Sequence, residues 1–411
     1  MIVSVIGLGY IGLPTAAVFA AHKVPVIGVD VNSDAVATIN AGGVHIIEPH
    51  LEQAIANAVQ DGLLRAVTAP EPADAFLIAV PTPFKGSNHE PDLSYIHSAA
   101  LSIASVLAPG NLVILESTSP VGATEQMADW LAAARPDLTF PQTAGDASDI
   151  RIAHCPERVL PGKVMKELIT NDRVIGGMTQ TCAKAAAELY KVFVEGDCVI
   201  ASSPRAAEMA KLTENSFRDT NIAFANELSV ICKDLDIDVW ELIALSNRHP
   251  RVNILQPGPG VGGHCIAVDP WFIVSKSPQT AKLIRTAREV NDSKPLWVLD
   301  QIQQKLTTAA AQIIFYGATF KPDIDDIRES PSLKIVQAAA AKWGDVFVVE
   351  PHIKITHPGV TQLDIAAART QDAIHVGLVA HAAFKAAQPV SGQRLDFARV
   401  WGAVDFAGSG S

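Results

Sequence analysis

The sequence is poor in cysteine. Only five of its 411 residues are cysteine, at positions 155, 182, 198, 232 and 265. An odd number of widely scattered cysteines does not describe the disulfide framework of a secreted protein. None of them belongs to a CxxC pair, which is a common spacing in structural zinc sites. We therefore expect reduced thiols, no bound metal and a cytoplasmic protein.

Basic residues are scarce as well. Lysine and arginine number 32 against 43 acidic residues, which gives a formal net charge of −11. Nucleic acid and anionic membranes repel such a chain, so neither is an expected partner. No apolar run reaches the length of a membrane span. Residues 2–21 are apolar, but they lack a basic start and contain three regularly spaced glycines, so we do not interpret them as a signal peptide.

The first residues contain a glycine-rich motif in a strand–turn–helix context. A short β-branched run, residues 2–6, leads into Gly7-Leu-Gly9-Tyr-Ile-Gly12 and then into an alanine-rich helix to about residue 21. A second strand, residues 24–29, ends at Asp30. This is the dinucleotide-binding fingerprint of a Rossmann-like domain. Asp30 accepts hydrogen bonds from ribose hydroxyls, and no arginine follows it to bind a 2′-phosphate, so NAD is favoured over NADP.

Further alternation of strands and helices predicts a parallel sheet covered on both faces. Strands are expected at 75–80, 112–117, 151–155 and 174–176. Ligands bind beyond the carboxyl ends of such strands, which makes Thr82 and Thr118 candidates for the cofactor edge. Both hydroxyls could equally form turns or cap helices. Glu157, at another strand end, is either a catalytic base or a solvated turn acid.

One long helix, residues 205–235, follows, because neither glycine nor proline interrupts it. Lys211, Asn215 and Arg218 share one face of it, which is either a solvated stripe or part of a catalytic site. After a short helix at 239–245, His249 and Arg251 could bind an anionic substrate or cap helix ends.

A glycine- and proline-rich loop, residues 256–269, follows these helices. It presents one thiol, Cys265, and an acid, Asp269. Backbone without Cβ atoms can approach a ligand closely. The loop is therefore a candidate site of chemistry, and the alternative is an incidental buried cysteine.

The alternation restarts near residue 295, with a helix at 296–306, strands at 312–316 and 346–349, and Gly317 between them. A single glycine at the first turn argues against a second dinucleotide, whereas a mononucleotide remains compatible. Lys321 and Arg328 are candidate phosphate ligands, or partners of nearby aspartates. We predict an α/β protein with two Rossmann-like doubly wound domains, 1–203 and 295–411, joined by a helical region at 204–294. The end of the chain, residues 408–411, is expected to be a frayed tail.

Several motifs in one order resemble the UDP-glucose/GDP-mannose dehydrogenase family over nearly the whole chain. They are Gly7–Gly12, Glu116-Ser-Thr118, Cys155-Pro-Glu157-Arg158, Lys211-x-x-x-Asn215, Gly262-Gly-His-Cys265-x-x-x-Asp269, and Phe320-Lys321 followed by Arg328-x-Ser-Pro331. One departure concerns the UDP-glucose enzymes, which usually carry lysine just before the loop aspartate, where this chain has Val268. That difference argues for another UDP-linked sugar.

The resemblance implies a four-electron oxidation of a sugar C6 alcohol to a carboxylate with two NAD⁺. Cys265 forms a thiohemiacetal and then a thioester, Lys211 is the acid/base partner, Asn215 and Asp269 position it and a water, and Glu157 is the hydrolytic base. The implied NAD ligands are Gly7, Gly9, Tyr10, Ile11, Gly12, Asp30, Thr82, Thr118 and Arg328. The implied nucleotide-sugar ligands are Arg158, Val159, Lys211, Asn215, Arg218, His249, Arg251, Gly262, Phe320 and Lys321.

The resemblance also implies a homodimer through the long helix, in which the partner subunit can contribute the segment with His249 and Arg251. Three rival functions fit the sequence less well. A short-chain epimerase needs a Tyr-x-x-x-Lys pair, and none of the four tyrosines has lysine four residues on. A metal-dependent alcohol dehydrogenase needs ligand spacings that the two His-Cys pairs lack. A non-catalytic NAD sensor does not explain the thiol loop.

Overall fold

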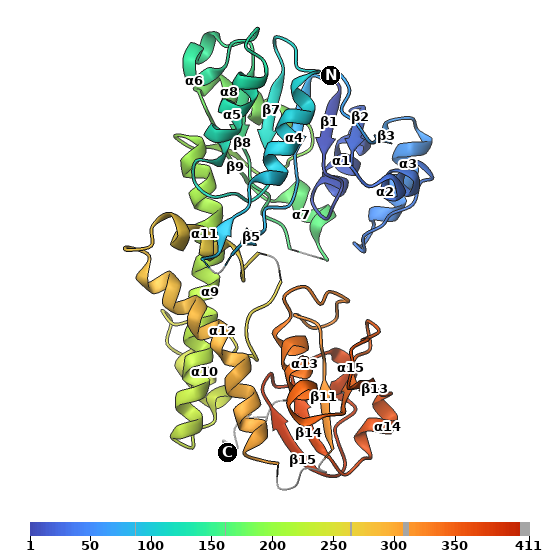
Figure 1. Ribbon diagram of the computed structural model, residues 1–411, viewed down its shortest axis with the longest axis vertical. Helices are drawn as coiled ribbons and strands as arrows, with labels where there is room; N and C mark the ends of the chain where they lie inside the picture. Colours follow the sequence, from blue (N-terminus) through green and yellow to red (C-terminus); the bar gives the residue numbers. More distant parts are fainter. Residues whose placement is uncertain (87, 161, 264, 307–311, 403–411) are drawn as a thin grey trace. The chain divides into compact units, whose positions relative to one another are not determined.

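An eight-stranded sheet forms the first half of the computed structural model, which describes residues 1–86, 88–160, 162–263, 265–306 and 312–402 (Figure 1). Its strand order is β10-β9-β8-β7-β4-β1-β2-β3. The strands are β1 Val3–Ile6, β2 Val26–Val29, β3 Leu64–Val67, β4 Ala75–Ile78, β7 Leu112–Leu115, β8 Arg151–His154, β9 Arg173–Gly177 and β10 Cys198–Ile200. Strands β1, β2, β4 and β7 are buried throughout, as β-branched and leucine runs covered on both faces should be.

Helices cover this sheet and divide its core into two clusters. They are α1 Gly12–Ala21, α2 Ser33–Asn40, α3 Leu51–Gln60, α4 Ser94–Ala104, α5 Ala123–Ala134, α6 Pro141–Ala144, α7 Val164–Thr170 and α8 Gln180–Tyr190, with a 3₁₀ turn at Gly145–Ala147. A small hairpin pairs β5 Phe84–Lys85 with β6 Glu90–Pro91. The order β3-β2-β1-β4-β7-β8 is that of a doubly wound dinucleotide-binding sheet, whose direction of winding changes between β1 and β4.

The prediction of an all-parallel sheet was wrong at one edge. Strand β9 pairs with β8 in antiparallel fashion, at Ala153 opposite Gly177 and His154 opposite Gly176. The reason is the connection between them: α7 packs against α1 instead of covering the sheet as a crossover helix. Strand β9 therefore enters at the end where β8 leaves, and β10 then runs parallel to β9.

Four helices form the middle of the chain: α9 Pro204–Asp234, α10 Val239–Ser246, α11 Asp269–Lys276 and α12 Lys282–Gln303. The long helix is confirmed, but the predicted helix start near residue 296 was wrong. Helix α12 continues through Pro295, one turn beyond the buried Asn291. Proline removes one hydrogen bond of a helix and disfavours its continuation. Here the buried side chains of α12, which pack on both sides of Pro295, outweigh that local cost.

The last part of the chain is a second parallel sheet, with strand order β13-β12-β11-β14-β15. Its strands are β11 Ile313–Tyr316, β12 Val346–Val349, β13 Val360–Gln362, β14 Ile374–Gly377 and β15 Gln393–Asp396, and its helices are α13 Pro331–Trp343, α14 Ile365–Arg369 and α15 Ala382–Lys385. This arrangement confirms the predicted second Rossmann-like sheet. Its winding changes direction between β11 and β14. The predicted tail at 408–411 lies outside the described residues.

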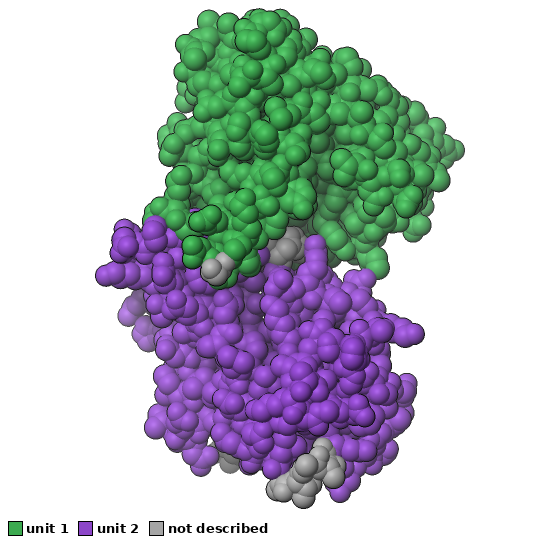
Figure 2. All heavy atoms as spheres, viewed as in Figure 1, with its two compact units in different colours: residues 1–214, 275–277 green, residues 215–274, 278–411 purple. Residues whose placement is uncertain are grey.

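Two compact units divide the chain (Figure 2). Unit 1 comprises residues 1–214 and 275–277, and unit 2 comprises residues 215–274 and 278–411. The division falls inside α9, between Glu214 and Asn215. No helix in the described parts of the chain combines the length and the apolar character that crossing a membrane requires.

Candidate active site

The glycine motif of unit 1 forms the turn between β1 and α1. Gly7 has φ +92°, and a Cβ there would stand 2.8 Å from the Ala79 carbonyl oxygen. A Cβ on Gly12 would stand 1.8 Å from the Gly7 oxygen, so the helix can approach the turn only with glycine at this position. A Cβ on Gly9, by contrast, would meet nothing within 4 Å. Protein packing does not require glycine at position 9, whereas the close approach of a pyrophosphate does.

Asp30 follows β2 and Thr82 lies beyond the end of β4, the two strands that flank β1 in the sheet of unit 1. Asp30 accepts hydrogen bonds from the Leu8 N–H and the Asn32 N–H, both at 2.9 Å, and its oxygens retain lone pairs for ribose hydroxyls. The Thr82 hydroxyl oxygen is buried and has no hydrogen-bond partner among the described residues. Thr118 is half-buried at the end of β7. The residues present therefore fit a dinucleotide.

Glu157, just beyond β8, is buried and held on both oxygens. The Arg158 N–H donates to Oε1 at 2.6 Å, and the Arg173 guanidinium donates to Oε2 at 2.5 Å. Arg173 is itself buried at the start of β9 and lies 5.0 Å above the Tyr190 ring. Sequence reasoning missed Arg173, because β8 and β9 meet only through the antiparallel pairing that it did not foresee.

A second buried carboxylate, Glu116, belongs to the same network. The Tyr190 hydroxyl donates to Glu116 Oε1 at 2.5 Å. Burial raises the pKa of Glu116 to about 7, because the nearby Arg173 offsets only part of the cost of removing its charge from water. Burial likewise raises the pKa of the neighbouring Cys155 thiol to about 12, so that Cys155 stays protonated. Glu116 was noted only as part of a motif, and nothing in the sequence marks its burial.

Arg158 lines an open cavity of about 450 Å³ together with Thr170, Asn171, Asp172 and Glu214. Its guanidinium forms an ion pair with Glu214 at 2.7 Å, and the Asn171 amide donates to the Arg158 carbonyl at 3.0 Å. Val159 is half-buried beside it. Arg158, a predicted substrate residue, thus lies at an accessible, polar surface of unit 1.

Lys211 lies on α9 and is only 9% exposed. No carboxylate of the described chain forms an ion pair with it. A buried lysine without a counter-ion is costly, which is typical of a functional position. Four residues further along α9, the Asn215 amide donates to Asp269 Oδ2 at 2.6 Å, and both side chains are buried. The structure therefore brings together the predicted pair of Asn215 and Asp269 in unit 2.

Cys265 lies half-buried in the turn that leads into α11. Its carbonyl accepts hydrogen bonds from the Val268 N–H at 3.1 Å and the Asp269 N–H at 2.8 Å. These two bonds start α11 and place the thiol-bearing residue at the positive end of its backbone dipoles. His264, which precedes the thiol in the predicted loop, lies outside the described residues.

The glycines before Cys265 pack against the segment 320–331. A Cβ on Gly262 would stand 2.7 Å from both the Glu329 oxygen and the Phe320 Cβ, and the Gly263 N–H donates to the Arg328 carbonyl at 3.0 Å. Earlier in the loop, the Gly258 N–H donates to Asn226 Oδ1 at 2.8 Å. The loop is thus held at both ends within unit 2, and Phe320 lies directly against its glycines.

Asn226 belongs to a buried polar network between α9 and α12. Its amide donates to Asn291 Oδ1 at 2.8 Å, and Asn291 donates to Asp219 Oδ1 at 2.8 Å. Arg288 closes the network through an ion pair with Asp219 at 2.5 Å. Buried hydrogen bonds and an ion pair between two helices favour one arrangement of those helices. Through the bond from the Gly258 N–H to Asn226, this network anchors the start of the thiol loop to α9.

The remaining predicted residues of unit 2 differ in exposure. Arg218, His249 and Arg251 are exposed, and Phe320 and Lys321 are half-buried. Arg328 forms an ion pair with Asp326 at 2.6 Å. Pairing with a nearby aspartate was the alternative to phosphate binding that the sequence left open for this residue. Tyr10 and Ile11 are half-buried in the glycine turn of unit 1.

Comparison with known proteins covers the chain almost from end to end. Three sequence models of the UDP-glucose/GDP-mannose dehydrogenase family match it: the NAD binding domain at residues 1–194, the central domain at 205–293 and the UDP binding domain at 314–398. Two curated relatives are UDP-N-acetyl-D-mannosamine dehydrogenase of Yersinia pestis, 62% identical over 94% of this chain and 95% of the relative, and NDP-N-acetyl-D-galactosaminuronic acid dehydrogenase of Ralstonia nicotianae, 60% identical over 93% and 91%.

Two solved structures are similar over nearly their whole length. A UDP-D-ManNAc dehydrogenase from Pyrococcus horikoshii has a TM-score of 0.88 and 34% identity, covering 99% of this chain and 98% of its own. A UDP-N-acetyl-mannosamine dehydrogenase from Staphylococcus aureus has a TM-score of 0.82 and 40% identity, covering 94% and 90%.

Proposed function

Because the chain belongs to the UDP-glucose/GDP-mannose dehydrogenase family, we propose that it oxidises UDP-N-acetyl-D-mannosamine at C6 to UDP-N-acetyl-D-mannosaminuronate, as an NAD-dependent enzyme. The observation that carries this proposal is the thiol of Cys265, presented by a fixed glycine loop beside the buried pair of Asn215 and Asp269. The relatives named for UDP-N-acetyl-D-mannosamine support the choice of sugar.

The oxidation needs one thiol for a chemical reason. NAD⁺, when bound, supplies a hydride acceptor. Loss of one hydride and one proton turns the C6 alcohol into an aldehyde, to which the Cys265 sulfur adds, forming a C–S bond and a thiohemiacetal. Loss of a second hydride and proton from the same carbon gives a thioester. Water then breaks the C–S bond, which releases the carboxylate and returns the thiol.

The flanking residues take the proton-transfer roles. Lys211, buried and without an ion-pair partner among the described residues, exchanges protons with the C6 oxygen and stabilises its negative charge. Asn215 and Asp269 position that lysine and the hydrolytic water. Glu157 is the base for thioester hydrolysis, and its hydrogen bonds to Arg173 and to the Arg158 N–H hold its carboxylate in one orientation.

The binding roles divide between the units. The NAD ligands that we propose are Gly7, Gly9, Tyr10, Ile11, Gly12, Asp30, Thr82, Thr118 and Arg328. The nucleotide-sugar ligands that we propose are Arg158, Val159, Lys211, Asn215, Arg218, His249, Arg251, Gly262, Phe320 and Lys321. The exposure of Arg218, His249 and Arg251 leaves their side chains accessible to an anionic substrate or to a partner subunit.

We further propose a cytoplasmic homodimer that serves bacterial surface polysaccharide synthesis. Helix α9 carries three exposed apolar residues at seven-residue spacing, Phe217, Phe224 and Ile231, whose side chains are 69%, 51% and 45% exposed. Such a stripe on one helix face is typical of a surface that another protein covers. The domain roles that we propose are NAD binding for residues 1–203, dimerisation and the thiol loop for 204–294, and UDP-sugar binding for 295–411.

A second candidate is the same C6 oxidation on a nucleotide-linked N-acetylgalactosamine, which the relative from Ralstonia nicotianae favours. Oxidation of UDP-N-acetylglucosamine or UDP-glucose is a further alternative. Each candidate keeps the thiol chemistry and changes only the sugar that the pocket accepts.

One assay separates these candidates. Purified protein should be supplied with NAD⁺ and each UDP-sugar in turn, and NADH should be measured together with the acid product. We expect UDP-N-acetyl-D-mannosamine to react fastest, with two NADH per acid formed. One NADH per sugar excludes the four-electron reaction. Preference for another sugar reassigns the substrate.

The Cys265→Ser variant tests the role of the thiol, and Cys198→Ser is its matched control. Cys265→Ser should bind NAD⁺ with wild-type affinity and form no acid. Cys198→Ser, at the other half-buried cysteine, should leave the stoichiometry and the rate unchanged.

A further inference from the structure

The second sheet repeats, residue for residue, a contact that marks the dinucleotide site of the first. In unit 1 the acid after β2, Asp30, accepts a hydrogen bond at 2.9 Å from the N–H of Leu8, which follows Gly7. In unit 2 the acid after β12, Glu350, accepts one at 2.8 Å from the N–H of Ala318, which follows Gly317. The two carboxylates thus hold equivalent positions at the carboxyl edges of two sheets.

Their remaining contacts differ. Asp30 is half-buried, whereas Glu350 is 4% exposed and contacts His381 Nε2 at 3.2 Å through Oε2. Its other oxygen accepts the His352 N–H at 3.0 Å. Burial raises the pKa of Glu350, but the hydrogen bonds from His381, Ala318 and His352 outweigh it and hold the pKa below its usual value. The carboxylate that offers lone pairs to a ribose in the first sheet is committed to protein partners in the second.

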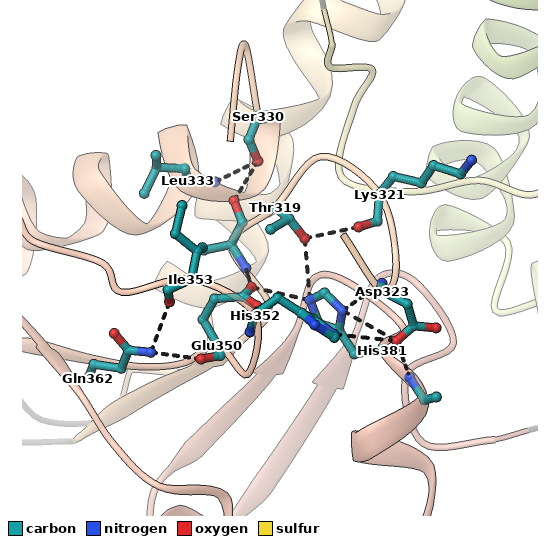
Figure 3. Close-up of polar contacts among 12 residues, drawn as sticks. Thr319, Lys321, Asp323, Ser330, Leu333, Glu350, His352, Ile353, Gln362 and His381 are labelled. Atoms are coloured by element: carbon teal, nitrogen blue, oxygen red, sulfur yellow. Dashed lines mark hydrogen bonds and ion pairs between the residues drawn. The ribbon is translucent and has the colours of Figure 1, made fainter. Parts of the chain in front are cut away.

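His381 connects Glu350 to the turn 319–323. The Asp323 N–H donates to His381 Nδ1 at 2.9 Å, so Nδ1 accepts and the proton of the neutral ring lies on Nε2, toward Glu350. The Thr319 hydroxyl lies 3.3 Å from His381 Nε2 and donates to the Lys321 carbonyl at 2.9 Å. Figure 3 shows both ends of the turn gathered on the His381 ring, while the Lys321 side chain points away from it.

The turn needs such support. Asp323 has φ +59°, a left-handed conformation that costs non-glycine residues energy. Its Oδ1 accepts the Ala382 N–H at 2.9 Å, which ties the turn to the residue after His381. Together these bonds determine the backbone on both sides of Phe320 and Lys321.

A metal ion is the rival interpretation of this cluster. Asp323, His352 and His381 each offer one ligand atom, and these atoms lie within 4.8 Å of one another. The lone pair of His381 Nδ1 already accepts the Asp323 N–H, and its Nε2 faces Glu350. A metal would have to displace the bond that holds the turn, so the contacts favour a structural clamp.

We propose that His381 is a positioning residue for nucleotide-sugar binding: bridging Glu350 and the turn 319–323, it fixes the backbone that presents Phe320 and Lys321. The inference rests on the proposed function, in which these two residues bind the nucleotide sugar. It also agrees with the expectation that the second Rossmann-like sheet binds no second dinucleotide, because Glu350 is committed to protein partners.

The test removes the bond from His381 to the Asp323 N–H while it keeps the contact with Glu350. It measures UDP binding and turnover in separate experiments. H381Q retains an N–H donor toward Glu350 but places no acceptor at the position of Nδ1, where the Asp323 N–H now donates. The loss of one such bond typically weakens a structure by about 1 kcal/mol, so we expect about fivefold weaker binding of UDP by calorimetry and a similarly raised KM for the nucleotide sugar. The kcat and the Kd for NAD⁺ should change less than twofold. Amide exchange of Asp323 should accelerate.

The control is H375Q, at a buried histidine of β14 in the same sheet, which contacts the Tyr316 hydroxyl at 3.1 Å and not the turn. It should lower the Tm and leave the UDP affinity unchanged. T319V removes the hydroxyl between His381 and Lys321 and leaves Glu350 unchanged. It should weaken UDP binding as H381Q does, and it replaces H381Q in the test if H381Q does not fold.

Two outcomes overturn the inference: unchanged UDP affinity in folded H381Q or T319V, or an equal loss in H375Q. If the wild-type protein binds UDP but oxidises no nucleotide sugar, the proposed reaction fails while the UDP affinities still decide the role of His381. Two results would instead show that the cluster binds a metal: Zn²⁺ alone restores the UDP affinity of H381Q, or a chelator lowers the UDP affinity of the wild-type protein.

Discussion

The buried carboxylates Glu116 and Glu157 lie in one network and differ in what neutralises them. Glu157 pairs directly with Arg173 at 2.5 Å, whereas Glu116 has only the Tyr190 hydroxyl on one oxygen and no partner on Oε2 among the described residues. An unpaired buried carboxylate prefers its neutral form. Glu116 is therefore the group in this network that exchanges a proton near neutral pH.

This difference predicts a pH-dependent stability. The folded-state pKa of Glu116, about 7, lies above the ordinary 4.5, so its contribution to stability is fully present below pH 4.5 and is lost as pH rises through 7. Glu116→Gln mimics the neutral form. The shift corresponds to about 3 kcal/mol, so E116Q should gain Tm relative to wild type between pH 5 and pH 8.

The control is Glu188→Gln, at an exposed glutamate of α8 that pairs with Lys191. The Tm difference between E188Q and wild type should not change with pH. This comparison separates the titration of Glu116 from the general effect of pH on the protein. A constant Tm difference between E116Q and wild type at all pH values contradicts the predicted titration. Melting curves in a series of buffers at one ionic strength measure it.

The sequence points to candidate ligand-facing residues more readily than to the residues that support them. The glycine turn, Asp30 and the thiol loop each carry a local pattern that limits the backbone or the chemistry. Arg173 and His381 act through partners distant in the chain, and a long-range contact leaves no mark in one sequence. Glu350 is intermediate: its place at the end of a second strand was visible, and its buried partner was not.

At the scale of elements, the buried parallel strands and the long α9 were predictable because each has an uninterrupted pattern. The errors lie where tertiary contacts override a local rule. Helix α12 passes through Pro295, and β9 runs antiparallel to β8. In both cases packing, which one sequence does not display, outweighs a local preference, and for Pro295 that preference is worth about 3 kcal/mol.

The thiol loop provides a matched pair of glycines. A Cβ at Gly262 would overlap the Glu329 backbone oxygen at 2.7 Å, whereas one at Gly258 would meet nothing within 4 Å. Overpacking costs about 1–3 kcal/mol, so Gly262→Ala should lower the Tm and reduce kcat/KM at least tenfold by displacing the loop from Phe320. Gly258→Ala keeps its N–H bond to Asn226 and should retain stability and activity. Equal effects of the two substitutions contradict the packing account.

At the scale of the whole molecule, the exposed stripe on α9 bears on assembly. Phe224 is its middle residue, and placing a charge there is costly if a second subunit covers it. We expect Phe224→Asp to weaken or abolish the proposed dimer in sedimentation equilibrium while the secondary structure stays intact.

Lys233→Asp is the control, because its position is half a turn round α9 from Phe224. It should leave the sedimentation of the protein unchanged. A wild-type monomer at micromolar concentration, or a dimer that tolerates charges at both Phe217 and Phe224, argues against assembly through this helix.

The division of the chain inside α9 limits how the protein can be taken apart. The chain passes between the units three times, at residues 214–215, 274–275 and 277–278. The first of these points lies within a continuous helix, one residue before Asn215 and three after Lys211. A genetic cut there exposes unsatisfied backbone groups and separates two adjacent turns that we assign to one reaction. The units are therefore poor candidates for modular exchange, and chimaeras between relatives should be joined in the loops beyond α9.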